Sequence, residues 1–244
     1  MPHRRSALLL AILLPVAAWA DDIQGLVLPL KQVSVASPVL QELINSVLVE
    51  EGDTVTEGQI LIQLSAEKEA LEVEQYTKLV EQRTFVATGA AALAKDKMMS
   101  KEAMLEKQTE MELAKIQLRQ AEVRFKEKTI RSTLAGIVVK KYKEAGESVD
   151  RVEKLLDIVN IDQVYVQFFL DPKLIGVIKT EQLVTVRVPV IGDSAFDGKV
   201  SFVDPRIDAG SGLFRVKVLL DNPRHVIKPG MRATADFAKL TAAK

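Results

Sequence analysis

The pattern of apolar and polar positions divides the chain into strand-like and helix-like regions. Residues 23–36 (IQGLVLPLKQVSVA) are apolar and partly alternating, which predicts one or two strands broken near Pro29. Residues 65–129 contain no proline and one glycine and are rich in Ala, Glu, Lys, Gln, Leu and Met, a composition typical of helix. Residues 160–238 return to short alternating segments, which predict a small β-barrel.

The helical region carries two apolar stripes with a 3.5-residue repeat, the spacing of a coiled coil. The repeat predicts two helices of about 29 residues, each ~43 Å long, folded as an antiparallel hairpin. Ser65 and Ser100 are the predicted N-caps, and KDKMM (95–99) is the predicted turn. The first stripe comprises Ala66, Ala70, Val73, Thr77, Val80, Thr84, Ala87, Ala91 and Ala94. The second comprises Met104, Met111, Ala114, Leu118, Ala121 and Phe125; Lys107 interrupts it and Lys128 ends it.

A short motif occurs twice, once on each side of the helical region. VEEGDTVTEGQIL (49–61) is echoed 94 residues later by KEAGESVDRVEKLL (143–156). Each copy predicts a set of short strands that cannot bury its apolar face alone. We therefore expect residues 37–64 and 130–159 to pack face to face as one β-sandwich, with the hairpin leaving from the turn that joins them. The equivalent positions include Gly52 and Gly146, Asp53 and Glu147, Val55 and Val149, Leu61 and Leu155, and Leu64 and Ile158.

The barrel region is punctuated by turn and cap signals. Asp171-Pro172 predicts the start of a short helix that ends at about Lys179. Lys228-Pro229-Gly230 suits a type II turn before the last strand, and residues 23–36 are expected to add a strand to the barrel. The alternating apolar positions are Val184, Val186, Val188 and Val190, then Phe214, Val216, Val218 and Leu220, and finally Met231, Ala233, Ala235 and Phe237.

The first 20 residues are interpreted as a signal peptide. Arg4 and Arg5 precede a twelve-residue apolar stretch, and Ala18-Trp19-Ala20 gives a small-x-small cleavage site before Asp21. An uncleaved anchor is the alternative, but twelve residues fall short of the ~20 that span a bilayer. Residues 21–36 are then the N-terminal strand region, and residues 239–244 are a C-terminal tail.

Composition excludes several function classes. Lys plus Arg equals Asp plus Glu at 33 each, so no nucleic-acid-binding surface is indicated. There is no cysteine, and the histidines are His3 and His225, which leaves neither a thiolate metal site nor a base for a serine nucleophile. Met98, Met99 and Met104 could ligate copper(I), but methionines near a helix tip more often supply adaptable apolar contact. We predict neither an enzyme nor a bound cofactor or metal.

The order of these parts resembles the membrane fusion protein (haemolysin-D-like) family, the periplasmic adaptors of tripartite efflux pumps. The resemblance is carried by EEGDTVTEGQILIQL (50–64), TIRSTLAGIVVKKYKEAGESV (129–149), GKVSFVDPRID (198–208) and KPGMRATADF (228–237). It implies an elongated α+β fold. An antiparallel coiled-coil hairpin (65–129) is inserted in a lipoyl-like β-sandwich, and a small β-barrel (160–238) follows.

The resemblance also implies a function. A non-catalytic periplasmic adaptor would link an inner-membrane transporter, proton-driven or else ATP-driven, to an outer-membrane channel. It would form a homo-oligomeric ring around a duct for small molecules or metal ions. The family's tip motif is an arginine, a leucine four residues on and a serine seven further; Leu93 and Ser100 match it, while Gly89 replaces the arginine. Ser100 could instead serve only as a helix cap. The expected channel contacts are Leu93, Lys97, Met98, Met99 and Ser100, and the expected turn glycines of the sandwich are Gly52, Gly58, Gly136 and Gly146.

Two other functions are compatible with parts of the sequence. A lipoyl or biotinyl carrier would place an acceptor lysine on the turn between the half-motifs, and Lys68 is the lysine nearest to that point. A structural coiled-coil protein of the cell envelope would use only the hairpin.

Overall fold

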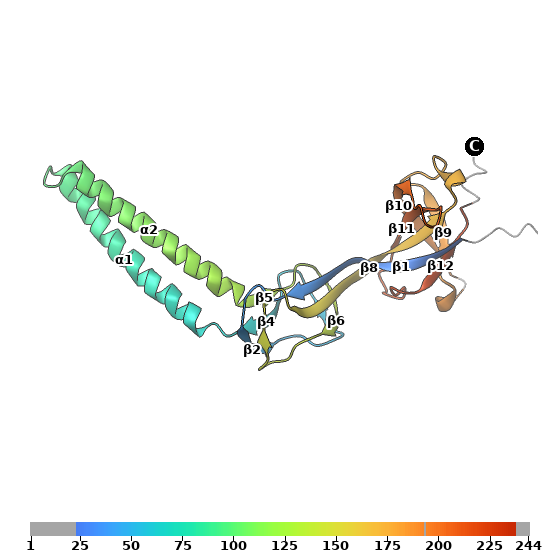
Figure 1. Cartoon of the computed structure of the whole chain (residues 1–244), viewed down its shortest axis with the longest axis horizontal. Helices are drawn as coiled ribbons and strands as arrows, with labels where there is room; N and C mark the ends of the chain where they lie inside the picture. Colours follow the sequence, from blue (N-terminus) through green and yellow to red (C-terminus); the bar gives the residue numbers. More distant parts are fainter. Residues whose placement is uncertain (1–22, 193, 238–244) are drawn as a thin grey trace, which may run out of the picture. The chain divides into compact units, whose positions relative to one another are not determined.

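The computed structural model describes residues 23–192 and 194–237 (Figure 1). The predicted signal peptide and the C-terminal tail lie outside the described residues. Two compact units are present. The first comprises residues 29–163 and 222–225 and holds the hairpin and the sandwich. The second holds the barrel and comprises, of the described residues, 23–28, 164–221 and 226–237.

The elements follow one another with short connections. In chain order they are β1 (Ile23–Ala36), β2 (Glu42–Val47), β3 (Thr54–Val55), β4 (Ile60–Leu64), α1 (Glu67–Lys95), α2 (Lys101–Glu127), β5 (Thr129–Arg131), β6 (Gly136–Lys141), β7 (Ser148–Val149), β8 (Lys154–Leu170), η1 (Pro172–Leu174), β9 (Leu183–Arg187), η2 (Pro189–Ile191), β10 (Ala195–Ile207), β11 (Phe214–Asp221) and β12 (Arg232–Ala235).

The two half-motifs fold onto each other as predicted. One sheet has the order β5-β4-β2-β7, and β3, β6 and β8 are neighbours in the other. Each sheet therefore takes strands from both halves. One buried cluster lies between them, formed by Val35, Ile44, Val49, Val55, Leu61, Ile62, Leu64, Ile130, Leu134, Val138, Val149, Leu155, Leu156 and Ile158.

Backbone hydrogen bonds repeat the symmetry of the sequence. The Gly52 N–H donates to the Val138 carbonyl at 2.8 Å, and the equivalent Gly146 N–H donates to the Ile44 carbonyl at the same distance. Because each bond joins one half to the other, neither half can keep its hydrogen bonds alone.

The helices form the predicted antiparallel hairpin, and Figure 1 shows α1 and α2 side by side. α1 has 29 residues and α2 has 27. The residues that are fully buried within them are all alanines, which lets the two backbones approach closely. They are Ala87, Ala90, Ala114 and Ala121.

The predicted stripes are wrong at particular positions. Ala70 and Thr84 are exposed, whereas Ala90, which lies off the first stripe, is buried. Phe125 is 41% exposed and lines a pocket at the root of the hairpin together with Ala66 and Ala70. A strict 3.5-residue step drifts by about 20° per heptad against a straight α-helix, so a stripe extrapolated over four heptads leaves the contact face.

Ser65 is not the N-cap of α1. Ala66 occupies that position, and no side-chain cap bond is formed there. The Ser65 N–H instead donates to the Leu43 carbonyl at 2.9 Å. Ser65 thus remains attached to the edge of the sandwich, and the helix begins without a side-chain cap.

The barrel runs through β1, β12, β9, β10, β11 and β8, and a β8–β1 pairing closes it. β1 is one continuous strand, so Pro29 does not break it, and its start (Ile23–Leu26) pairs with β12. β8 likewise continues from the sandwich into the barrel. Phe168 and Phe237 meet edge-on in the barrel interior, with ring centroids 5.1 Å apart.

Two local predictions in the barrel need correction, and one is confirmed. Asp171 does cap a turn, but this is only the short 3₁₀ helix η1, because the backbone at Ile175 is already extended. β9 ends at Arg187, so Val190 lies in η2 and is 74% exposed. The type II turn is confirmed: Gly230 has φ +91° and the Met231 N–H donates to the Lys228 carbonyl at 3.2 Å.

Gly136 is not a turn glycine. It opens strand β6, where an added Cβ would lie 2.4 Å from the Val159 carbonyl oxygen. Glycine is needed here for the close approach of two strands. Gly52, Gly58 and Gly146 do have the positive φ values of turn glycines.

The repeat exposes one strained residue. Val152 occupies the position equivalent to Gly58: its N–H donates to the Ser37 carbonyl, as the Gly58 N–H donates to the Ser132 carbonyl. Val152 has φ +66° and is 75% exposed. A β-branched residue in this conformation is strained and gains little from burial here.

We predict that Val152→Gly raises the free energy of unfolding by about 0.5–1 kcal/mol. Relief of the left-handed penalty of about 1–2 kcal/mol exceeds the extra unfolded-state freedom of glycine, about 0.5–1 kcal/mol. Urea denaturation of the purified protein measures the change. The matched variant Gly58→Val should lower stability by about 1–2 kcal/mol. A loss of stability in Val152→Gly would contradict the assignment of strain.

Candidate functional site

The hairpin tip combines exposed apolar and basic side chains. Leu93 is 43% exposed and Met98 76%, whereas Met99 is half-buried. The Met98 N–H donates to the Leu93 carbonyl at 2.8 Å, which folds the loop back over the end of α1. Lys97 is exposed in a left-handed conformation, with φ +59°. The predicted contact residues therefore lie together, and the surface they form suits a partner that offers apolar pockets and acidic groups.

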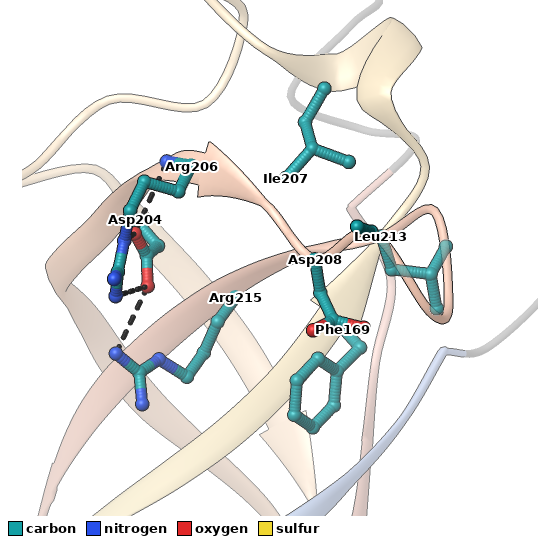
Figure 2. Close-up of a pocket in the computed structure, with 8 residues that line it drawn as sticks. Phe169, Asp204, Arg206, Ile207, Asp208, Leu213 and Arg215 are labelled. Carbon is teal, nitrogen blue, oxygen red and sulfur yellow. Dashed lines mark hydrogen bonds and ion pairs between the residues drawn. The ribbon is translucent and has the colours of Figure 1, made fainter.

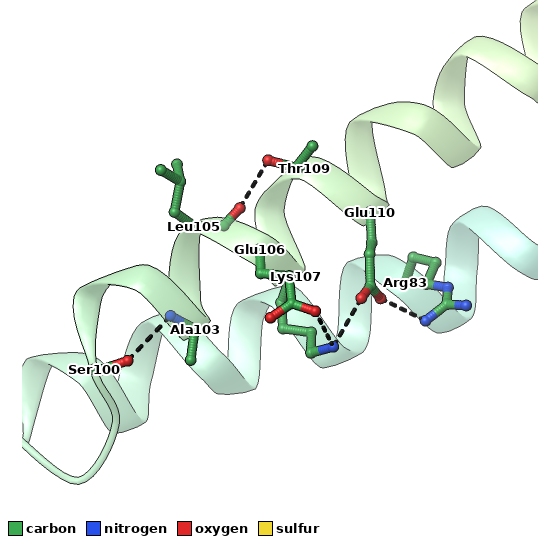
Figure 3. Close-up of polar contacts among 8 residues, drawn as sticks. All are labelled: Arg83, Ser100, Ala103, Leu105, Glu106, Lys107, Thr109 and Glu110. Carbon is green, nitrogen blue, oxygen red and sulfur yellow. Dashed lines mark hydrogen bonds and ion pairs between the residues drawn. The ribbon is translucent and has the colours of Figure 1, made fainter.

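Ser100 has a defined structural role at this tip. Its hydroxyl oxygen accepts a hydrogen bond from the Ala103 N–H at 3.1 Å (Figure 3). This confirms Ser100 as the N-cap of α2. Glu102 lies in the first turn, where a carboxylate interacts favourably with the helix dipole.

Two ion pairs across the hairpin fix which residues of the helices lie level with each other. Arg83 contacts Glu110 at 2.6 Å and Arg124 contacts Glu72 at 2.7 Å. Lys107 also donates to Glu110, at 2.8 Å, and this hydrogen bond holds the pKa of the Glu110 carboxyl below its usual value (Figure 3). Such partly exposed pairs add little stability, so their main effect is to select the register.

A buried lysine joins the root of the hairpin to the sandwich. The Lys128 side chain is 5% exposed and forms ion pairs with Glu42 of β2 and, at 2.9 Å, with Glu69 of α1. Burial raises the pKa of Glu69, but the hydrogen bonds from Lys128 and the backbone outweigh it and leave the pKa below its ordinary value. The same two carboxylates hold the pKa of Lys128 above its ordinary value in spite of burial. One ammonium thus ties both helices to the first half of the sandwich.

The barrel has a separate cleft of about 330 Å³ (Figure 2). Asp204 lies in it between Arg206, at 3.2 Å, and Arg215, at 3.0 Å, and the hydrogen bonds from Arg206 hold the pKa of the Asp204 carboxyl low. The Asp208 carboxylate accepts from the Ser211 N–H at 2.8 Å. Both carboxylates of the cleft are therefore paired within the chain.

Neither a metal-ligand cluster nor a membrane-spanning helix is found in the part of the chain that the structure describes. No group of three or more His, Asp or Glu side chains there could hold a metal ion. No described helix is long and apolar enough to cross a bilayer.

Comparison with known proteins agrees with this architecture. Residues 163–241 match the family model of the CusB-like β-barrel domain. Nodulation protein NolF of Rhizobium meliloti (strain 1021) is 23% identical over 229 residues, which cover 88% of this chain and 62% of NolF. The chain thus spans less than two thirds of this curated relative.

Solved structures of the same fold include a membrane fusion protein. A MacA–MexA chimera with the Pseudomonas aeruginosa MexA α-hairpin has a TM-score of 0.78 at 18% identity, over 87% of this chain and 76% of the chimera. The membrane fusion protein Spr0693 of Streptococcus pneumoniae R6 has a TM-score of 0.70 at 19% identity, over 87% and 96%. The resemblance to the membrane fusion protein family is confirmed. The inserted hairpin and the barrel both have this fold, and the barrel region is the part that matches the CusB-like β-barrel model.

Sequence reasoning missed two clusters of ion pairs, one in the hairpin and one at its root. Lys107 and Lys128 stood out only as interruptions of an apolar stripe, yet each is the centre of an ion-pair cluster. A charged residue at a stripe position was the available signal. Its acidic partners come from other elements, so they could not be named before the fold was known.

We predict that Ser100→Ala lowers the free energy of unfolding by about 1 kcal/mol, because the first turn of α2 loses its cap. Ser100→Asp should retain wild-type stability, since aspartate caps equally well and suits the helix dipole. Denaturant unfolding followed by circular dichroism measures both. Equal losses in the two variants would show that the serine hydroxyl has a role other than capping.

Removing the Lys128 charge should lower the free energy of unfolding more than removing the Ser100 cap does. Lys128→Met keeps an unbranched apolar side chain of nearly the same length but leaves two carboxylates unpaired, and we expect a loss of about 2–4 kcal/mol at about pH 7. The paired Glu69 contributes stability above its unfolded pKa and loses it as the pH falls through the lower folded pKa. The difference between Lys128→Met and wild type should therefore shrink at about pH 3. A difference that is constant with pH would contradict the ion-pair account, and adding Glu69→Gln should recover part of the loss.

Proposed function

We propose that the protein is a non-catalytic periplasmic adaptor. It links an inner-membrane efflux transporter to an outer-membrane channel and assembles as a ring around an exit duct for small molecules or metal ions. The observation that carries this proposal is the hairpin inserted in a sandwich whose two halves hold its root. This arrangement holds the hairpin at its root in the sandwich, and it brings no reactive groups together.

The hairpin tip is the proposed channel contact. Leu93, Lys97 and Met98 supply exposed apolar or basic surface there, with the half-buried Met99 beside them. Methionine adapts well to irregular partner surfaces. Ser100 supports this contact by capping α2 with its hydroxyl oxygen rather than by touching the channel itself. The barrel is directed to the transporter, which we expect to be proton-driven, with an ATP-driven pump as the alternative.

The carrier function is less well supported. A carrier lysine must project from a tight turn between the two halves, but the hairpin occupies that connection and Lys68 lies in the first turn of α1. A purely structural envelope protein would not account for the barrel. Export by a cleaved signal peptide, which the proposal requires, rests on the sequence of residues 1–20.

We predict that Met98→Glu reduces recovery of an outer-membrane channel with the affinity-tagged adaptor by at least about tenfold, because one desolvated charge costs more than ~1.4 kcal/mol. Pulldown from cross-linked envelopes, quantified by mass spectrometry, measures this recovery. Met98→Leu should behave as wild type, and transporter recovery should be unchanged in both variants. The proposed function is overturned if the wild-type protein recovers neither a channel nor a transporter.

A further inference from the structure

The cleft in the barrel holds charged groups that the proposed function does not use. Its volume of about 330 Å³ lies at the lower end of the range of small-molecule sites, roughly 300–1,000 Å³. All the residues that line it belong to the barrel unit. Figure 2 shows Asp204 and the two arginines on one side of the cleft, and Asp208 and Phe169 on the other. The two sides differ in charge.

The arginine side of the cleft has an excess of one positive charge. Arg206 and Arg215 share the Asp204 carboxylate, so one negative group faces two guanidinium groups. Arg215 donates to Asp204 through Nη2 alone, at 3.0 Å. Its Nε is buried without a partner, whereas its Nη1 makes no hydrogen bond within the described chain and is not buried. Nη1 is therefore the donor that a ligand in the cleft can reach.

The Arg215 guanidinium is held in place by two contacts. Besides the hydrogen bond to Asp204, its central carbon lies 5.5 Å from the centroid of the Phe202 ring, a cation–π contact. A side chain that is already fixed loses less conformational entropy when a ligand binds. Because arginine forms strong, directional hydrogen bonds with carboxylates, this group is a preorganised donor for one.

The other side of the cleft carries a negative charge that no cation balances. Asp208 accepts from the Ser211 N–H and hydroxyl through a single oxygen, Oδ1, at 2.8 Å each. These hydrogen bonds hold the pKa of the Asp208 carboxyl below its usual value, and no cation contributes to the shift. Backbone hydrogen bonds close the turn: the Asp208 N–H donates to the Leu213 carbonyl, and the Gly212 N–H to the Asp208 carbonyl. The turn therefore does not require the negative charge of Asp208.

The cleft also has an apolar wall. Phe169 is 46% exposed and Ile207 49%, and Leu213 is half-buried. All three side chains line the cleft. Covering exposed apolar surface contributes about 25 cal/mol per Å². A ligand with an apolar group gains from this wall, whereas a small inorganic ion does not.

Together these features select one class of ligand. The charges of the cleft cancel as a whole, but the excess cation and the uncompensated carboxylate are not paired with each other. A simple anion would be repelled by Asp208 and a simple cation by Arg215, whereas a zwitterion is attracted by both.

We propose that the barrel cleft binds a small zwitterion with an apolar side chain, of the amino-acid type. Its carboxylate accepts a hydrogen bond from Arg215, its ammonium group donates to Asp208, and its side chain packs on Phe169. The inference goes beyond the proposed function, which gives the barrel a protein partner but no ligand of its own.

Isothermal titration calorimetry on the purified protein tests the ligand class with three probes that differ in charge. L-Phenylalanine has both charges, N-acetyl-phenylalanine has only the carboxylate, and phenylalanine amide has only the ammonium group. We expect phenylalanine to bind, and each of the other two to bind at least about tenfold more weakly, because one charge-assisted hydrogen bond is lost. Equal affinities for the three probes, or no binding of phenylalanine at millimolar concentration, would overturn the proposal.

Three substitutions assign the charges to their residues. Asp208→Asn removes the negative charge but keeps a side-chain oxygen that can accept from Ser211. It should weaken phenylalanine binding about tenfold and should not weaken binding of N-acetyl-phenylalanine, because only the ammonium group needs Asp208. Arg215→Gln should weaken the binding of both probes. Asp197→Asn is the matched control: it removes an exposed carboxylate from β10 outside the cleft and should change neither affinity.

The variants also separate this inference from a loss of structure and from the adaptor function. If Asp208→Asn weakens both probes equally, or has no more effect than Asp197→Asn, the proposed role of Asp208 is wrong and the proposal fails. If Arg215→Gln does not fold, as circular dichroism would show, Asp208→Asn and the three probes still decide. Binding is measured on the protein alone, so a selective site without recovery of channel or transporter leaves this inference standing and removes the adaptor function; recovery of both without phenylalanine binding does the reverse.

Discussion

The pairing of the two half-motifs is the interaction on which the rest of the structure depends. Their strands are two to six residues long in β2 to β7, too short to be stable as separate hairpins. Shared sheets and exchanged hydrogen bonds make them one core and bring the two ends of the hairpin together, as the 2.8 Å bond from the Leu64 N–H to the Lys128 carbonyl shows. The helices can start and finish at one place only because the halves are paired.

The hairpin contributes less to its own stability than its length suggests. Its fully buried residues are four alanines, which permit close packing but bury little apolar area each. The register therefore relies on ion pairs such as Arg83–Glu110, and the attachment relies on Lys128. A buried lysine between two carboxylates is costly to desolvate, and its value here lies in fixing where both helices leave the sandwich.

The sequence predicted the features that are written locally or repeated. The Ser100 cap and the turn at Gly230 follow from patterns a few residues long, the two helices from local composition and periodicity, and the paired half-motifs from the repeat. The errors arose where a residue distant in the sequence determines the local structure. Ser65 stays hydrogen-bonded to Leu43 of the sandwich and α1 begins one residue later than expected, with Ala66 at the N-cap. The carbonyl of Val159 makes Gly136 a packing glycine. Of the candidate site, the tip could be named in advance, whereas the Lys128 cluster depends on the three-dimensional pairing of β2, α1 and α2.

The hairpin has an unusual distribution of apolar side chains, with small residues inside and large ones such as Phe85 and Leu113 outside. A solitary rod would expose this surface to water at no gain. In an assembly that covers it, each neighbour binds only the folded hairpin and so adds to its stability by mass action. The proposed ring would in this way add to the stability of a hairpin whose inner interface is weak.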